Sequence, residues 1–162
     1  ASWLGGVVAA SVIGTYEHMI ESIIALAAFI PVIIGMGGNI GTQSSTIIVR
    51  GMATGRIEVG SELLVLIKEL KVGLILGVLY GVLLGIFANL KFIGTDPMLG
   101  LVVGLSIAAS MLIAVTVGSF TPLILRKLEI DPAVAAGPFV TTSIDILGVL
   151  LYFVIAGILL KV

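Results

Sequence analysis

Long apolar runs without charged residues are the feature that most restricts the fold of this chain. Residues 72–90 and 102–125 contain no Asp, Glu, Lys or Arg and show no alternation of apolar and polar residues. At about 1.5 Å per helical residue, each run can cross a hydrocarbon core of ~30 Å. Only helices and closed barrels satisfy their backbone in lipid, and a barrel needs alternating strands of about ten residues. The runs therefore predict an all-α integral membrane bundle.

The composition of the 162 residues agrees with a membrane protein. Hydrophobic residues make up 59% and charged residues only 10%, whereas a soluble domain is about 25% charged. The formal net charge is −1 and no basic block occurs, which argues against nucleic acid as a partner. Cysteine is absent, so disulfides and thiolate metal sites are excluded.

Charges and turn residues divide the chain into five apolar segments, which we expect to be five transmembrane helices. They are residues 3–15, 21–55, 71–92, 98–125 and 132–160. The second is too long for one regular span, and Pro31 and the glycine-rich residues 35–41 interrupt it, so we expect a broken second helix. The Asp-Pro pairs at residues 96–97 and 131–132 combine a capping carboxylate with a proline at the first helical position, which indicates helix starts.

Basic residues near the segment ends predict the orientation. Six of the eight lie on one side: Arg50, Arg56, Lys68, Lys71, Arg126 and Lys127. Cytoplasmic ends collect Lys and Arg, so we expect the N-terminus inside and the C-terminus outside. Residues 57–71 are amphipathic, and we expect an interfacial helix there, or a docking site for a cytoplasmic partner domain.

Four glycines in the third segment follow a regular spacing. Gly73, Gly77, Gly81 and Gly85 recur every four residues. Small residues at this spacing lie on one helix face and let two helices approach closely in a membrane. We expect them to be packing residues.

Asp145 is the one acidic residue placed deep in an apolar segment. It lies about 20 Å along a helix from the start of segment five, and a carboxylate at such depth usually marks an ion or proton path. Thr141, Thr142 and Gly148 share its helix face. This oxygen-rich surface suits a hard cation such as hydrated Mg²⁺. The alternative is a protonated or hydrogen-bonded aspartate that joins helices.

The second segment carries a polar stripe. Asn39, Gln43 and Thr46 are spaced at i, i+4 and i+7, and the expected break in the backbone lies beside them. Irregular backbone at membrane depth is tolerated where it lines a watery cavity or is buried in protein. The stripe therefore favours a pathway, with hydrogen bonding between helices as the alternative.

Three motifs resemble the membrane domain of the MgtE family of magnesium channels. They are PVIIGMGGNIGTQS at residues 31–44, DPA at residues 131–133 and TTSIDILG at residues 141–148. The resemblance covers nearly the whole chain in order and spacing. It implies a homodimeric channel in the cell membrane, surrounded by lipid, with a pore along the two-fold axis lined by the second and fifth helices.

The resemblance also assigns roles to residues. Asp145, one from each subunit, would bind hydrated Mg²⁺, and the carbonyl of Thr141 would face that ion. We further expect Gly35, Asn39, Gln43, Gly137 and Thr142 to line the pore, although Gly137 stands where some relatives carry a polar residue. Family members usually carry cytoplasmic regulatory domains that sense Mg²⁺. Since this chain holds none, we expect residues 1–162 to be a single transmembrane pore domain. It is either excised from a longer protein or a naturally short relative, and the abrupt start on an apolar run favours excision.

The expected function is passive flux of Mg²⁺ along its electrochemical gradient, with no enzymatic step. One alternative is a proton- or sodium-coupled divalent cation exporter that uses Asp145 as its coupling site. Another is an intramembrane aspartyl hydrolase, which needs two neighbouring carboxylates where one chain offers a single deep one. A third is a passive assembly subunit in which Asp145 seals an interface.

Overall fold

The computed structural model describes residues 2–57 and 62–161, and every regular element in these two ranges is a helix. The helices are α1 (Ser2–Thr15), α2 (Glu17–Ser22), α3 (Ala25–Ala53), α4 (Glu62–Lys91), α5 (Leu99–Lys127) and α6 (Pro132–Leu160). Four of the helices in this part of the chain, α3 to α6, are long and apolar enough to cross a membrane. The predicted all-α membrane bundle is confirmed at this level. Since α1 has only 14 residues, five spans and the orientation stay predictions.

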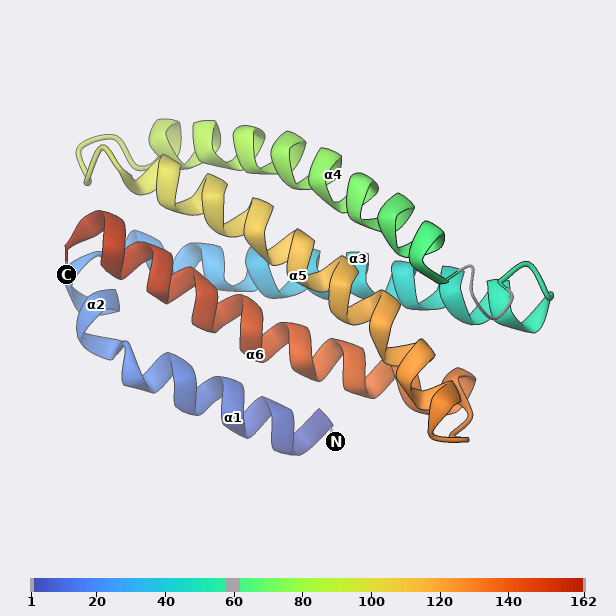
Figure 1. The fold of residues 1–162 in the computed structure, drawn as a ribbon. Helices are drawn as coiled ribbons and strands as arrows, with labels where there is room; N and C mark the ends of the chain where they lie inside the picture. Colours follow the sequence, from blue (N-terminus) through green and yellow to red (C-terminus); the bar gives the residue numbers. More distant parts are fainter. Residues whose placement is uncertain (1, 58–61, 162) are drawn as a thin grey trace.

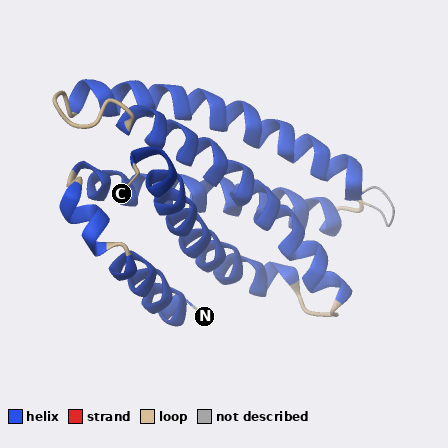
Figure 2. Ribbon diagram, turned by 60° about the vertical axis from the view of Figure 1, so that its left-hand side comes forward, coloured by secondary structure: helices blue, strands red, loops and turns tan. Residues whose placement is uncertain are grey.

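Helix α5 is the centre of the bundle. It packs against α3, α4 and α6, whereas α4 packs almost solely against α5 and α1 packs against α6 (Figure 1). In Figure 1 the N-terminus lies beside the first half of α6, short of the end where α6 begins, and α1 runs from there along the rest of that helix. Figure 2 shows the same order from the side, with α4 and α1 at opposite edges of the bundle. The arrangement leaves one side of α3 and much of α4 uncovered.

The hydrophobic core is concentrated at the end of the bundle where α6 finishes. Leu26, Phe29, Tyr152 and Phe153 are all buried there. The Tyr152 hydroxyl donates a hydrogen bond of 2.9 Å to the carbonyl of Leu26, and the ring of Tyr16 stacks on Phe153 with centroids 4.7 Å apart. A buried hydroxyl in an apolar core must find an acceptor, and this one joins α6 to α3.

The opposite half of the bundle has a much smaller core. Its buried cluster consists of Ala114, Val140 and Ile144. Most of the first two turns of α6 is exposed, with Ala136 the buried exception among residues 132–139. The two ends of α6 are therefore held with very different amounts of packing.

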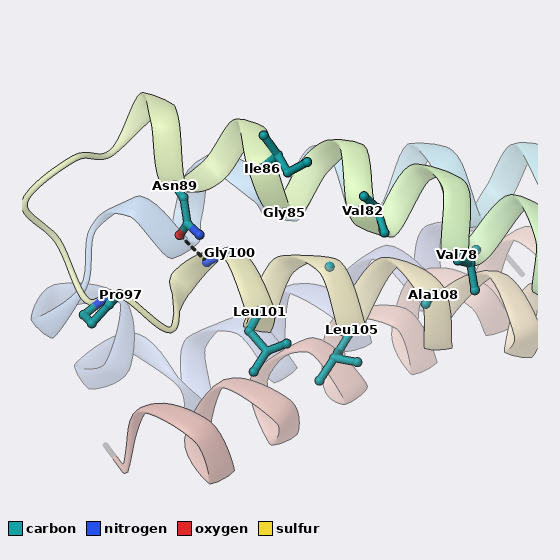
Figure 3. A pocket seen from close by; sticks show the side chains of 13 residues that line it. Val78, Val82, Gly85, Ile86, Asn89, Pro97, Gly100, Leu101, Leu105 and Ala108 are labelled. Carbon is teal, nitrogen blue, oxygen red and sulfur yellow. Dashed lines mark hydrogen bonds between the residues drawn. The ribbon is translucent and has the colours of Figure 1, made fainter.

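The glycines of α4 form a close seam with α5, which confirms the packing role predicted from their spacing. A Cβ atom on Gly81 would lie 2.6 Å from the carbonyl oxygen of Gly104, and one on Gly85 would lie 2.6 Å from that of Gly100. Neither position can hold a side chain unless the backbones separate. The seam borders an apolar groove of about 460 Å³ (Figure 3). Near its end, Asn89 Oδ1 accepts a hydrogen bond of 2.9 Å from the Gly100 N–H, which caps the start of α5.

The predicted break in the second helix is wrong, because α3 runs unbroken from Ala25 to Ala53. Pro31 is the seventh residue of α3 and lies on its exposed side, where the carbonyl that loses its partner can be accommodated. The interruption lies earlier, at the residues that join α2 to α3. Two of the glycines that suggested a break serve packing instead, since Gly37 and Gly41 face the side chain of Ile144.

The stretch predicted as an interfacial helix, residues 57–71, is helical from Glu62 onward, but it is continuous with the third apolar segment. Residues 58–61 lie outside the described residues, and from Glu62 the chain continues to Lys91 as the single helix α4.

Of the two predicted caps, Asp131 is confirmed, because its side chain accepts the Ala133 N–H at 2.9 Å. Asp96 accepts the Met98 N–H at 2.8 Å, but α5 begins only at Leu99.

Candidate functional site

One face of α3 is polar and uncovered. Its exposed residues include Gly35, Asn39, Gln43 and Thr46, which follow one another at the spacing of a single helix face. The Thr46 hydroxyl bonds back to the Thr42 carbonyl at 2.7 Å. The side-chain amides of Asn39 and Gln43 have no hydrogen-bond partner in residues 2–57 and 62–161. Amides cannot be left unpaired in lipid without cost, so this face needs water or protein against it.

The buried face of α3 brings this helix close to α5 and α6. A Cβ atom on Gly37 would lie 2.8 Å from Ile144 Cγ2, and one on Gly118 of α5 would lie 3.0 Å from the Cα atom of Gly41. Such contacts are possible only between glycines and well-fitted neighbours. They fix α3 beside α6 at the level of Ile144, the residue before Asp145.

Asp145 is half-buried in the middle of α6. Its carboxylate makes no hydrogen bond or ion pair with any described residue. Across the described residues, no three His, Cys, Asp or Glu side chains come close enough to hold a metal ion. One chain therefore supplies a single carboxylate at this depth, and a complete cation site needs ligands from elsewhere.

The two threonines before Asp145 point to different neighbours. The Thr141 hydroxyl bonds back to its own helix, at 3.2 Å from the Gly137 carbonyl and 3.3 Å from that of Pro138. Thr142 lies against α1, because a Cβ atom on Gly5 would be only 3.0 Å from the Thr142 Cβ. Thr141 therefore hydrogen-bonds within its own helix, one turn before Asp145, whereas Thr142 contacts the peripheral helix α1.

A groove of about 310 Å³ lies between α3 and α6 on the sparsely packed half. Thr42, Ser45 and Thr46 line it from α3, and Gly137 lines it from the first turns of α6. Gln43 lines a neighbouring depression of about 340 Å³ that shares both threonines. Asp145 lies about 12 Å further along α6 than Gly137. The structure thus brings Gly137 and Thr46 together and leaves Asp145 deeper in the bundle.

Sequence reasoning missed Thr42 and Ser45 in this groove. They precede Thr46 by four residues and one residue, in a stretch rich in hydroxyl side chains. Thr42 lies three residues after Asn39 and three residues before Ser45. This helical spacing is the signal that could have placed Thr42 and Ser45 beside the polar stripe.

A buried polar pair near the same end of the bundle was also missed. Glu69 falls in the amphipathic stretch at residues 57–71, but it is 8% exposed and lies in α4. Its Oε2 atom accepts a hydrogen bond of 2.8 Å from the Ser44 hydroxyl of α3. No local pattern announces this pair, because it depends on how α3 and α4 meet.

Comparisons with known proteins agree with one another. A family model described as a divalent cation transporter, MgtE, matches residues 30–155. A protein named magnesium transporter MgtE from Thermus thermophilus is 37% identical over 158 residues, which cover 98% of this chain and 34% of the relative. Proteins of the same name from Bacillus subtilis and Enterococcus faecalis are each 35% identical, over 93% and 96% of this chain and 33% and 34% of their own lengths. This chain spans about a third of the length of these relatives.

Proposed function

The chain belongs to the MgtE family of divalent cation transporters, and we propose that two copies of it form a pore that conducts Mg²⁺ passively across the membrane. The family and the four long apolar helices make it a multi-pass membrane protein. The proposed part of this function consists of the transported ion, the dimer and the residues that contact the ion. The exposed polar face of α3 is the observation that carries the proposal.

A polar helix face in a membrane bundle must meet water or protein. On α3 that face presents the amides of Asn39 and Gln43 beside the bare backbone of Gly35, where an added Cβ would meet nothing within 4 Å. An ion with its water shell needs such room and such donors and acceptors. A second chain placed with the same face opposite would enclose a polar channel between two copies of α3.

Asp145 supplies the charge that this channel needs. Mg²⁺ keeps several of its waters and binds through one or two carboxylates, so two copies of Asp145 on a two-fold axis suit it. The proposal gives each carboxylate a partner that it lacks among the described residues of one chain. The Thr141 carbonyl is the second proposed contact for the ion, one helical turn from Asp145.

The other predicted lining residues have different support. Gly35, Asn39 and Gln43 lie on the exposed face of α3, and Gly137 lies in the groove between α3 and α6. We place that groove at the inner mouth of the pore. Thr142 has less support, because its side chain contacts Gly5 of α1. In the full-length protein we propose that cytoplasmic regulatory domains complete the transporter, since the relatives are about three times as long as this chain.

Flux into liposomes that contain this chain tests the proposal. Vesicles loaded with a Mg²⁺-sensitive dye receive external Mg²⁺ under a negative-inside potassium diffusion potential, with no gradient of protons or Na⁺. We expect uptake that rises with the potential. The variant Asp145→Ala should reduce uptake at least 100-fold, and Asp145→Asn should be strongly impaired, because the neutral amide loses the charge that attracts the ion.

The matched control is Glu129→Gln, which removes one exposed carboxylate in the turn before α6. It should conduct like the wild-type chain, which separates the deep charge from net charge. Normal conduction by Asp145→Ala would overturn the pore assignment. Uptake that requires a proton or Na⁺ gradient would replace the passive pore with a coupled transporter.

A further inference from the structure

A basic cavity lies where α3 ends and α4 begins, next to the groove placed at the inner mouth of the pore, with which it shares Arg50. Its volume is about 410 Å³, and Arg50, Arg56 and Lys68 line it together with Thr54 and the buried Glu69. We propose that this cavity binds the phosphate headgroup of an anionic phospholipid, with an acyl chain lying along α4. This inference concerns the lipid around the protein and does not depend on the transported ion.

The charges in the cavity favour an anion. None of its three cationic side chains forms an ion pair with a described residue. The one carboxylate, Glu69, already accepts the Ser44 hydroxyl at 2.8 Å. Among the described residues that line the cavity, three positive charges against one negative charge leave an excess that a phosphate diester or monoester can neutralise. Basic pockets between transmembrane helices bind such headgroups.

The wall of the cavity is held by backbone hydrogen bonds. After α3 the chain turns back, and the N–H groups of Arg56 and Ile57 both bond to the Gly51 carbonyl, at 2.9 and 3.1 Å. The Ile57 side chain then lies on Gly51, where an added Cβ would be 2.7 Å from Ile57 Cγ1. This turn fixes the backbone of Arg56 beside the end of α3, where Arg50 also lies.

The surroundings favour a lipid over a soluble phosphate. Helices α3 and α4 scarcely touch each other, and Ile47 on the rim of the cavity is 51% exposed. Beyond Lys68, the next turns of α4 on the same side carry exposed Val72, Ile75 and Leu79. An acyl chain can follow this apolar strip while its headgroup stays at the cavity. The cavity also lies at the end predicted to be cytoplasmic, where membranes collect anionic lipid.

Native mass spectrometry of the detergent-solubilised chain tests the proposal. The chain is titrated with palmitoyl-oleoyl phosphatidylglycerol or with the zwitterionic palmitoyl-oleoyl phosphatidylcholine, and bound lipids are counted. We expect one phosphatidylglycerol to bind per chain before weaker sites fill. The double variant Arg56→Gln/Lys68→Gln should weaken that first site roughly 30-fold, at about fivefold for each cationic side chain near the phosphate.

The matched control is Arg126→Gln/Lys127→Gln, which removes the same charge at the end of α5 on the same side of the bundle. It should leave the first site within about twofold of wild type. Equal weakening by both double variants would mean diffuse attraction and overturn the proposal, as would equal affinity for the two lipids. A last experiment adds inorganic phosphate at 10 mM as a competitor. If it displaces phosphatidylglycerol fully, the ligand of the cavity is a soluble phosphate and the lipid proposal is overturned.

Discussion

The seam between α4 and α5 and the outward face of α3 are both rich in glycine, but their glycines do different things. In the seam, a side chain on Gly81 or Gly85 would collide with the backbone of α5. On the outward face of α3, a Cβ atom on Gly35 or Gly38 would meet nothing within 4 Å. The first set completes a contact inside the chain, whereas the second leaves space that no described residue fills.

The polar side chains of the two regions differ in the same way. Asn89 at the end of the seam pairs with the Gly100 N–H, while the amide of Asn39 has no partner among the described residues. A glycine pattern by itself therefore does not separate packing from a pathway. The state of the neighbouring polar groups does, because a finished interface satisfies them.

The strongest test of the seam is Gly81→Leu. A Cβ atom there would already lie 2.6 Å from the Gly104 carbonyl, so the larger side chain must push α4 from α5. We expect the free energy of unfolding to fall by roughly 3 kcal/mol or more, measured by SDS titration followed by circular dichroism. The neighbouring Val82→Leu, at a position 55% exposed, should change it by less than about 0.5 kcal/mol. Similar losses of unfolding free energy for both variants would mean that the seam is packed no more tightly than the exposed side of α4.

Two glycines of α3 test the difference within one helix. Gly37→Ala places a methyl 2.8 Å from Ile144 Cγ2 and 3.0 Å from Ser110 Oγ. Because these are side-chain atoms that can shift, we expect a loss of about 1–2 kcal/mol. Gly35→Ala meets open space and should be neutral, or stabilising by up to about 1 kcal/mol from helix propensity. Thermal unfolding of the two variants in one detergent measures both, and a destabilised Gly35→Ala would mean that its face is covered.

Asn39→Leu should impair transport and leave stability nearly unchanged, whereas Gly77→Ala should lower stability and leave transport unchanged. Asn39→Leu removes a proposed pore amide, so Mg²⁺ flux into liposomes should fall about tenfold with little change in unfolding. Gly77→Ala puts a methyl 3.0 Å from the Ala108 carbonyl and should cost about 1 kcal/mol of stability, with flux per folded chain unchanged. Equal effects on flux at equal expression would remove the case for the polar stripe.

The smallest expected effect concerns the two asparagines. Asn89→Ala leaves the Gly100 N–H at the start of α5 without its acceptor, and we expect a loss of about 1 kcal/mol, as for a helix cap. Asn39→Ala loses no bond within the described chain and should stay within about 0.5 kcal/mol. Chemical denaturation of both variants gives the comparison, and a larger loss at Asn39 would contradict the assignment of its face.

Features that depend on local sequence could be predicted. The charge-free runs predicted α4 and α5, the spacing of Gly73 to Gly85 predicted the seam, and Asp131 before Pro132 predicted the start of α6. Each rests on residues within one helix or its first turn. The predicted break at Pro31 failed because a proline near a helix start, on an exposed side, is tolerated.

The candidate site was predictable only in part. The depth of Asp145 follows from its distance to the start of its segment, and the stripe of Asn39 and Gln43 follows from helical periodicity. The burial of Glu69 beside Ser44 and the contact of Thr142 with Gly5 depend on how separate helices meet. No periodicity in one segment contains that information.

The hydrogen bond between Tyr152 and the Leu26 carbonyl has a mechanical consequence. It ties α6 to α3 at the well-packed end, while the first turns of α6 have few buried residues. The buried residues Ile144 and Val140 hold α6 against its neighbours as well, so the lightly held arm is the stretch before Val140. The arm from Val140 back to Pro132 is about 12 Å long. A bend of about 10° at Val140 would carry the start of α6 about 2 Å sideways, while the α3–α6 contacts from Ile144 to Tyr152 stay in place.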